Sequence, residues 1–85
     1  MPKVTMYTTP ICPYCVRAKM LLKKKGVVVE EVDVFMNSEA RAEMEAKSGG
    51  RYTVPQIFIG ERHVGGCDDL YALERAGELD ALLAA

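Results

Sequence analysis

The chain of 85 residues lacks tryptophan, long apolar runs and any excess of charge of one sign, and each shortage excludes a class of protein. No stretch approaches the roughly 20 consecutive apolar residues needed to cross a bilayer, so we expect no contact with the membrane interior. Eleven basic residues against twelve acidic ones give a net charge of -1, which provides no general attraction for nucleic acid. The sequence therefore predicts a protein that binds neither membranes nor nucleic acid.

Cysteine is also scarce, and its distribution bears on the compartment. The three cysteines include one C-x-x-C pair, Cys12 and Cys15, and do not form the even-numbered disulfide framework of a small secreted domain. The first seven residues lack the apolar segment and the small-residue cleavage site of a secretory signal. We therefore expect a cytoplasmic protein, in which such a pair is more often catalytic or metal-binding.

The chain does contain enough apolar material for one small core. Hydrophobic residues make up 49% of the sequence, which argues against disorder. Strand-like and helix-like patterns follow one another without a linker, an internal repeat or a low-complexity segment. We therefore expect a single domain over residues 1–85.

Apolar periodicity divides this domain into strands and helices. Residues 3–7 alternate polar and apolar side chains, which predicts a strand. From Pro13 to Gly26 apolar residues recur at helical spacing, so a helix is expected to begin at the cysteine motif. The expected elements are a strand over 3–7, a helix over 13–25, a strand over 27–34, a helix over 38–47, strands over 54–59 and 62–64, a helix over 68–76 capped by Asp68 and Asp69, and a short helix over 79–83.

The order of these elements predicts the fold. A strand-helix-strand unit at the start implies two parallel strands, and the tight turn at Gly60-Glu61 implies an antiparallel hairpin. The order β-α-β-α-β-β-α thus gives an α/β protein with a mixed four-stranded sheet covered by helices. This is the thioredoxin-like arrangement.

The position of Cys12 at a helix start suggests what the pair does. Disulfide exchange needs a thiolate, yet a free thiol is only a few per cent ionised at neutral pH. The backbone N–H groups of Tyr14 and Cys15 are expected to face the Cys12 sulfur, while Pro13 occupies the first helical position, where a missing donor costs nothing. The helix dipole supplies at most ~2 kcal/mol, so direct N–H to sulfur hydrogen bonds must contribute the remainder.

The spacing of the pair assigns a role to each cysteine. Two intervening residues on one helical turn bring the second sulfur within bonding distance of the first, so Cys15 can resolve a mixed disulfide formed on Cys12. Cys15 shares its helix face with Ala18 and Leu22, so we expect it to be the less exposed of the two. Cys12 is therefore predicted to be the nucleophile.

A zinc site is the alternative interpretation of the same pair. Cys67 and His63 could complete a set of three cysteines and one histidine. Here, however, the pair opens an amphipathic helix rather than a turn, and His63 lies in a strand pattern. We therefore predict no metal site.

Three motifs resemble those of the dithiol glutaredoxins, and most closely those of small bacterial members. They are Cys12-Pro13-Tyr14-Cys15, Thr53-Val54-Pro55 and Gly65-Gly66-Cys67-Asp68-Asp69, in this order and over nearly the whole chain. The resemblance implies a glutathione-dependent thiol-disulfide oxidoreductase that reduces glutathione mixed disulfides and protein disulfides. It further implies a monomer with glutathione as co-substrate and no tightly bound cofactor.

The resemblance also implies a glutathione site. The Val54-Pro55 bond is expected to be cis, with the Val54 backbone pairing with the cysteinyl part of glutathione. The backbone of Cys67 and Asp68 is expected to bind the γ-glutamyl end, and Arg51 the glycyl carboxylate. The implied binding residues are Tyr14, Arg51, Thr53, Val54, Pro55, Gly66, Cys67 and Asp68.

Several of these residues also fit simpler structural roles, and the chain departs from the family pattern at one position. Arg51 also fits an ordinary solvated loop residue, and Asp68 and Asp69 also fit simple helix caps. The side chain of Cys67 also fits a packing role only. Many glutaredoxins carry a lysine three residues before the first cysteine, where this chain has Thr9, which leaves more of the carboxylate binding to Arg51.

Two other functions are compatible with a C-x-x-C pair. A thioredoxin-like protein reduced by a flavoprotein normally has a Trp-Cys-Gly-Pro-Cys type loop, and this chain has no tryptophan. The second of these functions is to hold an iron-sulfur cluster between two chains. Pro13 directly after the first cysteine disfavours cluster binding.

Overall fold

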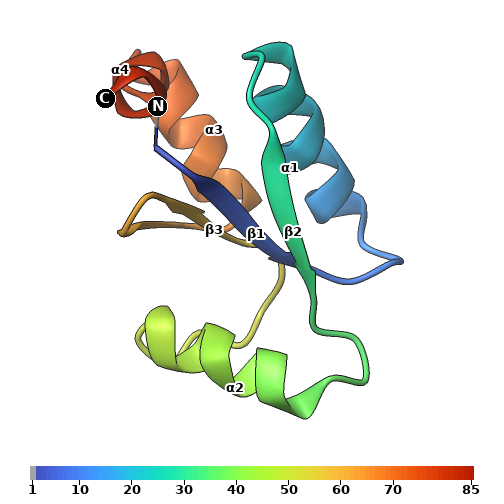
Figure 1. Ribbon diagram of the computed structural model, residues 1–85. Coiled ribbons are helices and arrows are strands. Elements are labelled where there is room, and N and C mark those ends of the chain that lie inside the picture. The colour runs from blue at the N-terminus through green and yellow to red at the C-terminus, as the bar shows by residue number, and fades with distance from the viewer. Residues whose placement is uncertain (1) are drawn as a thin grey trace.

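The computed structural model describes residues 2–85. Four strands form one sheet and four helices pack on its two sides (Figure 1). The elements in chain order are β1 (Val4–Thr8), α1 (Pro13–Lys24), β2 (Val29–Asp33), α2 (Ser38–Lys47), β3 (Gln56–Ile59), β4 (Arg62–Gly65), α3 (Cys67–Arg75) and α4 (Leu79–Ala84).

The sheet has the strand order β2-β1-β3-β4. Strand β1 pairs with β2 in parallel and with β3 in antiparallel fashion, and β3 pairs with β4 as a hairpin. This confirms the predicted mixed four-stranded sheet. The parallel register, with Val4 opposite Val29 and Thr8 opposite Asp33, brings the ends of β1 and β2 to one edge of the molecule. The loop that carries the cysteine motif and the loop after β2 therefore begin side by side (Figure 1).

The helices cover the two faces of the sheet unequally. Helices α1, α3 and α4 lie on one face and enclose the larger core, which includes Leu22, Ile57 and Leu70 (Figure 1). Helix α2 alone covers the other face, where a smaller core joins Tyr7, Met44 and two further buried residues. Only Met44 of α2 is buried, so this helix leaves part of its sheet face uncovered.

The main differences from the predicted boundaries concern two strands and the start of α3, and the other ends agree within one residue. The strand predicted over 27–34 is limited to Val29–Asp33, because only there does it pair with β1. The strand predicted over 54–59 begins at Gln56, after the Val54-Pro55 bond, which is cis as the resemblance implied. Helix α3 begins one residue earlier than predicted, with Gly66 at the cap position; of the two predicted capping residues, Asp69 acts from inside the first turn, where its carboxylate accepts the Gly66 N–H.

In the described part of the chain, no helix combines the length and the apolar character that a membrane span requires.

Candidate active site

The start of α1 holds the Cys12 sulfur against the helix backbone. Cys12 is the cap residue, in extended conformation, and its Sγ accepts a hydrogen bond from the Cys15 N–H at 3.1 Å. Pro13 occupies the first helical position, as predicted. Within residues 2–85 the Cys15 N–H is the only backbone N–H that donates to this sulfur, and the Tyr14 N–H, which was also expected to face it, makes no hydrogen bond with it. A cap side chain typically reaches the N–H of the third helical residue, which is Cys15.

The two sulfurs of the motif differ in burial and in proton affinity. Cys12 is 9% exposed and Cys15 3% exposed, and both are free thiols. Burial raises the pKa of the Cys15 thiol, and the hydrogen bond with Cys12 raises it further. A buried thiol that retains its proton is poorly suited to attack an external disulfide first. Cys12 is thus the more accessible residue of the pair and the one whose sulfur accepts a helix N–H.

A groove of about 340 Å³ is built from three segments distant in sequence, and the Cys12 Sγ lies 3.9 Å from the carbonyl oxygen of its lining residue Val54. Helix α1 contributes Tyr14, and the loop before β3 contributes its Arg51, Thr53, Val54 and Pro55. The start of α3 completes the wall. The structure places all eight residues implied by the resemblance in this one groove, and the full lining is Tyr14, Arg51, Thr53, Val54, Pro55, Gly66, Cys67, Asp68 and Asp69.

Asp69 is the member of this groove whose role the sequence analysis understated. Its Oδ2 accepts the Gly66 N–H at 2.9 Å and forms an ion pair with Arg51 Nη1 at 3.3 Å. Arg51 and Asp69 are both half-exposed, so the ion pair adds little to stability. Its effect is to hold the guanidinium at the rim of the groove. Asp69 lies three residues after the cap Gly66, and this capping-box spacing is the sequence signal that could have revealed it.

Gly65 is required where β4 turns into α3. Its φ of +116° lies in a region that favours glycine, and a Cβ there would collide with the Asp69 carboxylate and lie 2.9 Å from Arg51 Nη1. Any larger residue would therefore displace the ion pair. The same absence of a side chain lets the backbone at the start of α3 face the groove.

The Cys67 thiol differs from that of Cys12, although both lie at helix starts. Cys67 is the first helical residue of α3 and is buried, and this burial raises the pKa of its thiol. Asp68 and Asp69 occupy the same turn and oppose a further negative charge. The Cys67 side chain is therefore a neutral, packed part of the groove wall.

A buried polar network supports the loop that carries Val54. Gln56 is fully buried, and its amide nitrogen donates to the Thr53 carbonyl at 3.0 Å and to Thr53 Oγ1 at 3.2 Å. The amide oxygen of Gln56 then accepts from His63 Nε2 at 2.7 Å. Burial lowers the pKa of His63, and the positive charge of Arg51 lowers it further. The sequence analysis considered His63 only as a metal ligand and missed this network, which depends on the pairing of β3 with β4.

The zinc alternative finds no geometric support. Among residues 2–85, no three histidine, cysteine or acidic side chains lie close enough together to hold a metal ion. The Nε2 atom of His63 is engaged with Gln56 instead.

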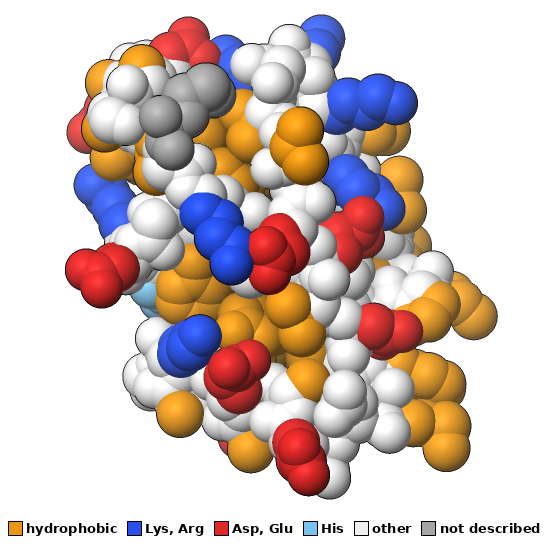
Figure 2. Space-filling model, in the orientation of Figure 1, with side chains coloured by type: hydrophobic (Ala, Val, Ile, Leu, Met, Phe, Trp, Pro, Cys, Tyr) orange, Lys and Arg blue, Asp and Glu red, His pale blue; other side chains and the backbone are white. Residues whose placement is uncertain are grey.

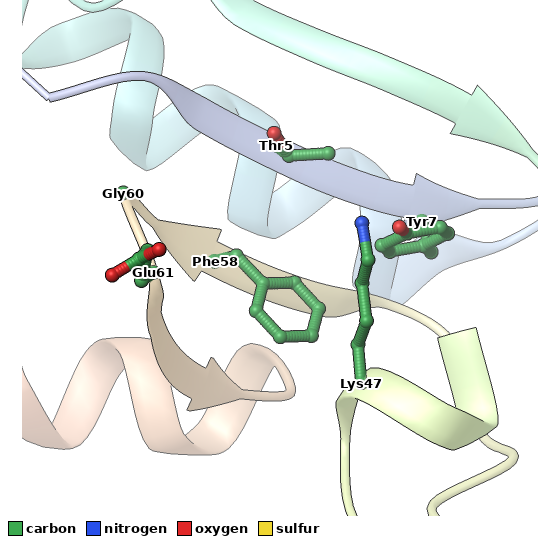
Figure 3. Close-up of a pocket in the computed structure, with 6 residues that line it drawn as sticks. All are labelled: Thr5, Tyr7, Lys47, Phe58, Gly60 and Glu61. Carbon is green, nitrogen blue, oxygen red and sulfur yellow. The ribbon is translucent and has the colours of Figure 1, made fainter. Parts of the chain in front are cut away.

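A second hollow, of about 330 Å³, lies on the sheet face that α2 leaves uncovered. The Phe58 and Tyr7 rings form its floor, and the Lys47 side chain reaches from α2 toward Tyr7 (Figure 3). Burial raises the pKa of Tyr7, whose hydroxyl donates to Glu43 Oε2 at 3.1 Å. None of its lining residues is a cysteine, so this hollow is separate from the redox pair.

Comparison with known proteins identifies the family. The glutaredoxin family model matches residues 4–64. A glutaredoxin of Pseudomonas aeruginosa is 62% identical over the full length of both chains, and glutaredoxin 3 of Escherichia coli is 55% identical over 98% of this chain and 99% of its own.

Solved structures agree in fold. The solution structure of a Brucella melitensis glutaredoxin has a TM-score of 0.84 and 60% identity, and covers 98% of this chain and 89% of its own. A buckwheat glutaredoxin, solved as a complex with glutathione, has a TM-score of 0.87 and 29% identity, with 98% and 77% of the two chains covered. These matches confirm the predicted thioredoxin-like fold. The chain belongs to the glutaredoxin family of thiol-disulfide oxidoreductases, as its three motifs predicted.

Proposed function

We propose that Cys12 and Cys15 are the redox pair with which this glutaredoxin reduces glutathione mixed disulfides and protein disulfides. One observation carries the proposal. The Cys12 Sγ accepts the Cys15 N–H at the start of α1, and Tyr14 between them borders a groove that all three family motifs line. A sulfur that accepts a helix N–H gains stabilisation in its anionic form, which is the form that attacks disulfides.

The first reaction uses Cys12 alone. Its thiolate attacks the glutathione sulfur of a mixed disulfide, so a bond forms between Cys12 and glutathione and the other thiolate leaves. A second glutathione, as thiolate, then attacks the glutathione sulfur on Cys12. Oxidised glutathione leaves with the new disulfide bond, and Cys12 returns as a thiolate.

The second reaction uses both cysteines. Cys12 attacks a protein disulfide and releases one protein thiolate, which leaves a mixed disulfide between Cys12 and the substrate. Cys15 loses its proton and attacks the Cys12 sulfur, so the second protein thiol is released and a Cys12-Cys15 disulfide forms. Two glutathione molecules reduce this disulfide. The raised pKa of Cys15 is consistent with a thiol that holds its proton until the mixed disulfide forms.

The groove beside Cys12 has the chemistry that glutathione requires. Backbone N–H groups at the start of α3, near Cys67, suit the γ-glutamyl carboxylate, and the Asp68 carboxylate suits the adjoining ammonium. Arg51 provides a cation for the glycyl carboxylate at the other end. The ion pair of Arg51 with Asp69 uses one of the guanidinium nitrogens, so others are available to the ligand.

We extend the proposal to the co-substrate, the protein partners, the compartment and the domain. Glutathione is a co-substrate rather than a tightly bound cofactor, and the protein partners are disulfide-containing or glutathionylated proteins. The protein acts as a monomer in the cytoplasm, and residues 1–85 form one glutaredoxin domain.

A coupled assay tests the proposal. Turnover of a small glutathione mixed disulfide is followed through NADPH oxidation in the presence of glutathione and glutathione reductase. A parallel assay replaces both with thioredoxin reductase. We expect turnover with glutathione, and loss of protein-disulfide reduction in Cys15→Ser while mixed-disulfide turnover continues. Turnover with thioredoxin reductase alone would contradict the proposal.

The same assay tests the groove. Asp68→Asn and Arg51→Gln should each raise the KM for glutathione about tenfold, because each removes one charge that faces the ligand. Glu45→Gln, a charge change on α2, which contributes no residue to the groove, is the matched control and should leave KM unchanged. An unchanged KM in both groove variants would place the glutathione site elsewhere.

A further inference from the structure

Two loops beside the redox pair expose an unusual amount of apolar surface. Ile11 is 93% exposed in the loop before α1, and Phe35 and Met36 are 57% and 91% exposed in the loop after β2. Apolar side chains project from the edge of the molecule where these loops lie (Figure 2). Single exposed apolar residues are ordinary, but a group of them beside a reactive site indicates an interaction surface. We call Pro10, Ile11, Phe35 and Met36 the two-loop patch.

The two halves of this patch lie against each other. Thr9, Pro10, Ile11 and Phe35 line one hollow of about 160 Å³. A second hollow of about 200 Å³ shares Thr9 and Pro10 with the first and extends to Cys15. The two hollows therefore adjoin at Thr9 and Pro10, with Cys15 lining one and Phe35 lining the other.

The loop after β2 is held in a conformation that keeps its apolar tip outward. The Phe35 N–H donates to Asp33 Oδ1 at 2.8 Å, and the Asn37 N–H donates to the Val34 carbonyl at 3.3 Å. Met36 has a φ of +51°, in the left-handed region that favours glycine. The fold thus sustains a strained methionine and an exposed phenylalanine at the same turn.

The two-loop patch and the glutathione groove lie on different sides of the motif. Among residues 2–85, the residues that line the patch hollows and those that line the glutathione groove have no member in common. Cys12 directly follows Ile11 and precedes the groove residue Tyr14. A substrate disulfide at the Cys12 sulfur can therefore be bordered by glutathione chemistry on one side and by the patch on the other.

We infer that the two-loop patch docks apolar side chains that flank the reactive cysteine of a protein or peptide disulfide. The inference rests on the proposed function and adds a substrate class to it. Cys12 is only 9% exposed, so a polypeptide disulfide that reaches its sulfur must cover the adjoining surface. Since Ile11 adjoins Cys12 in the chain, the substrate segment next to the disulfide is the occupant that covers the patch.

The charged groups around the patch already have partners, so apolar contacts determine which substrate segments the patch prefers. The Asp33 carboxylate is engaged by the Phe35 N–H, and Lys19 Nζ pairs with Glu31 Oε1 at 3.1 Å. These charges already have partners at the rim of the groove. A substrate gains more by burying an apolar side chain against Ile11 and Phe35 than by offering a charge.

Two disulfide-cyclised peptides of equal length test the inference. One carries leucine and phenylalanine next to its cysteines, and the other carries serine at both positions. The wild-type protein should reduce the apolar peptide about tenfold faster in kcat/KM, the effect of partly burying one large side chain. The double variant Ile11→Ser/Phe35→Ser should lose most of this preference.

A matched variant and a small substrate serve as controls. Val28→Ser replaces a side chain that is 91% exposed at the opposite end of β2, and it should keep the full preference. The small glutathione mixed disulfide should be turned over equally by all three proteins, because it does not reach the patch.

The outcomes separate this inference from the proposed function. Equal reduction of the two peptides by a wild-type protein that is active on the small mixed disulfide would overturn the inference alone. An equal loss of preference in Val28→Ser would overturn it too, because the effect would then be general. A wild-type protein inactive on the small mixed disulfide would overturn the proposed function, and the inference with it.

Discussion

A cysteine lies at the start of α1 and another at the start of α3, and the two starts differ in the charges that accompany the sulfur. At α1 the sulfur of Cys12 is itself the cap, and the first turn contains no acidic residue. At α3 the Asp69 carboxylate closes the turn on the Gly66 N–H, and Asp68 adds a second negative charge. The positive end of the α1 dipole is thus left for a thiolate, whereas that of α3 is already partly neutralised.

The comparison shows that a cysteine at a helix start is not by itself a reactive group. Burial raises the pKa of Cys67, and the neighbouring Asp68 and Cys12 raise it further, against a lowering contribution from the cation of Arg17. Burial, together with the charges that accompany the helix start, therefore makes Cys67 a wall residue rather than a nucleophile. Substitutions at the two helix starts test this difference between Cys12 and Cys67.

The largest difference should come from removing each thiol in turn. Cys12→Ser should reduce glutathione-dependent turnover at least about a thousandfold, because a hydroxyl cannot replace the attacking thiolate. Cys67→Ser should leave turnover within about threefold of the wild type, because its buried thiol stays neutral. The measurement is kcat/KM in the coupled assay, with circular dichroism to show that both variants fold. Comparable losses in both variants would remove the distinction between the two helix starts.

Placing the charge of α3 on α1 should slow the reaction of Cys12. Tyr14 is the second residue of α1, as Asp68 is of α3, so Tyr14→Asp brings an acidic side chain to the same position. A charge a few ångströms away at a half-exposed site is worth about 1 kcal/mol, so alkylation of Cys12 by iodoacetamide at neutral pH should slow about fivefold. Tyr14→Asn is the uncharged control, and equal slowing in both variants would exclude an electrostatic cause.

Removing the cap of α3 should affect stability. Asp69→Ala loses the hydrogen bond from the Gly66 N–H and the ion pair with Arg51, so the free energy of unfolding should fall by about 1 kcal/mol. Asp68→Ala is the control, because this exposed neighbour changes stability by less than about 0.5 kcal/mol at a typical surface site. Urea unfolding measures both, and an equal loss in the two variants would argue against a specific cap.

The helices and strands, and the position of Cys12 at the start of α1, could be predicted from the sequence because they depend on local patterns. Apolar spacing after Pro13, the tight turn at Gly60 and the β-branched run before Val34 each involve neighbouring residues. The three motifs also indicated which distant segments meet, and the structure places them around one groove.

The remaining features depend on contacts between segments and could not be predicted from local patterns. The ion pair of Arg51 with Asp69 forms across 18 residues of sequence, and it requires β4 to end at a glycine without a side chain. The hydrogen bond of Gln56 to His63 follows from the register of a hairpin that contains a bulge. The hollow over Phe58 exists because α2 buries only one of its side chains against the sheet.

The smallest expected effect is a pH response confined to the α3 side of the groove. Burial and the charge of Arg51 lower the pKa of His63 in the folded protein below its ordinary value of 6.5. The unfolded chain therefore takes up this proton first, so the stability is fully present above about pH 6.5 and falls as the pH drops toward the lower folded pKa. Urea unfolding between about pH 7.5 and 5.5 should show this decline in the wild type and a flatter profile in His63→Gln, which keeps a donor for Gln56 but cannot titrate.

The alkylation rate of Cys12 in the same two proteins compares this response with the start of α1. Protonation of His63 acts beside Arg51 and Asp69. The wild-type rate divided by the His63→Gln rate should therefore not change over the same pH range. A parallel decline in stability in His63→Gln would assign the pH response to another group, and a rate ratio that changed with pH would show that the two helix starts are electrostatically linked.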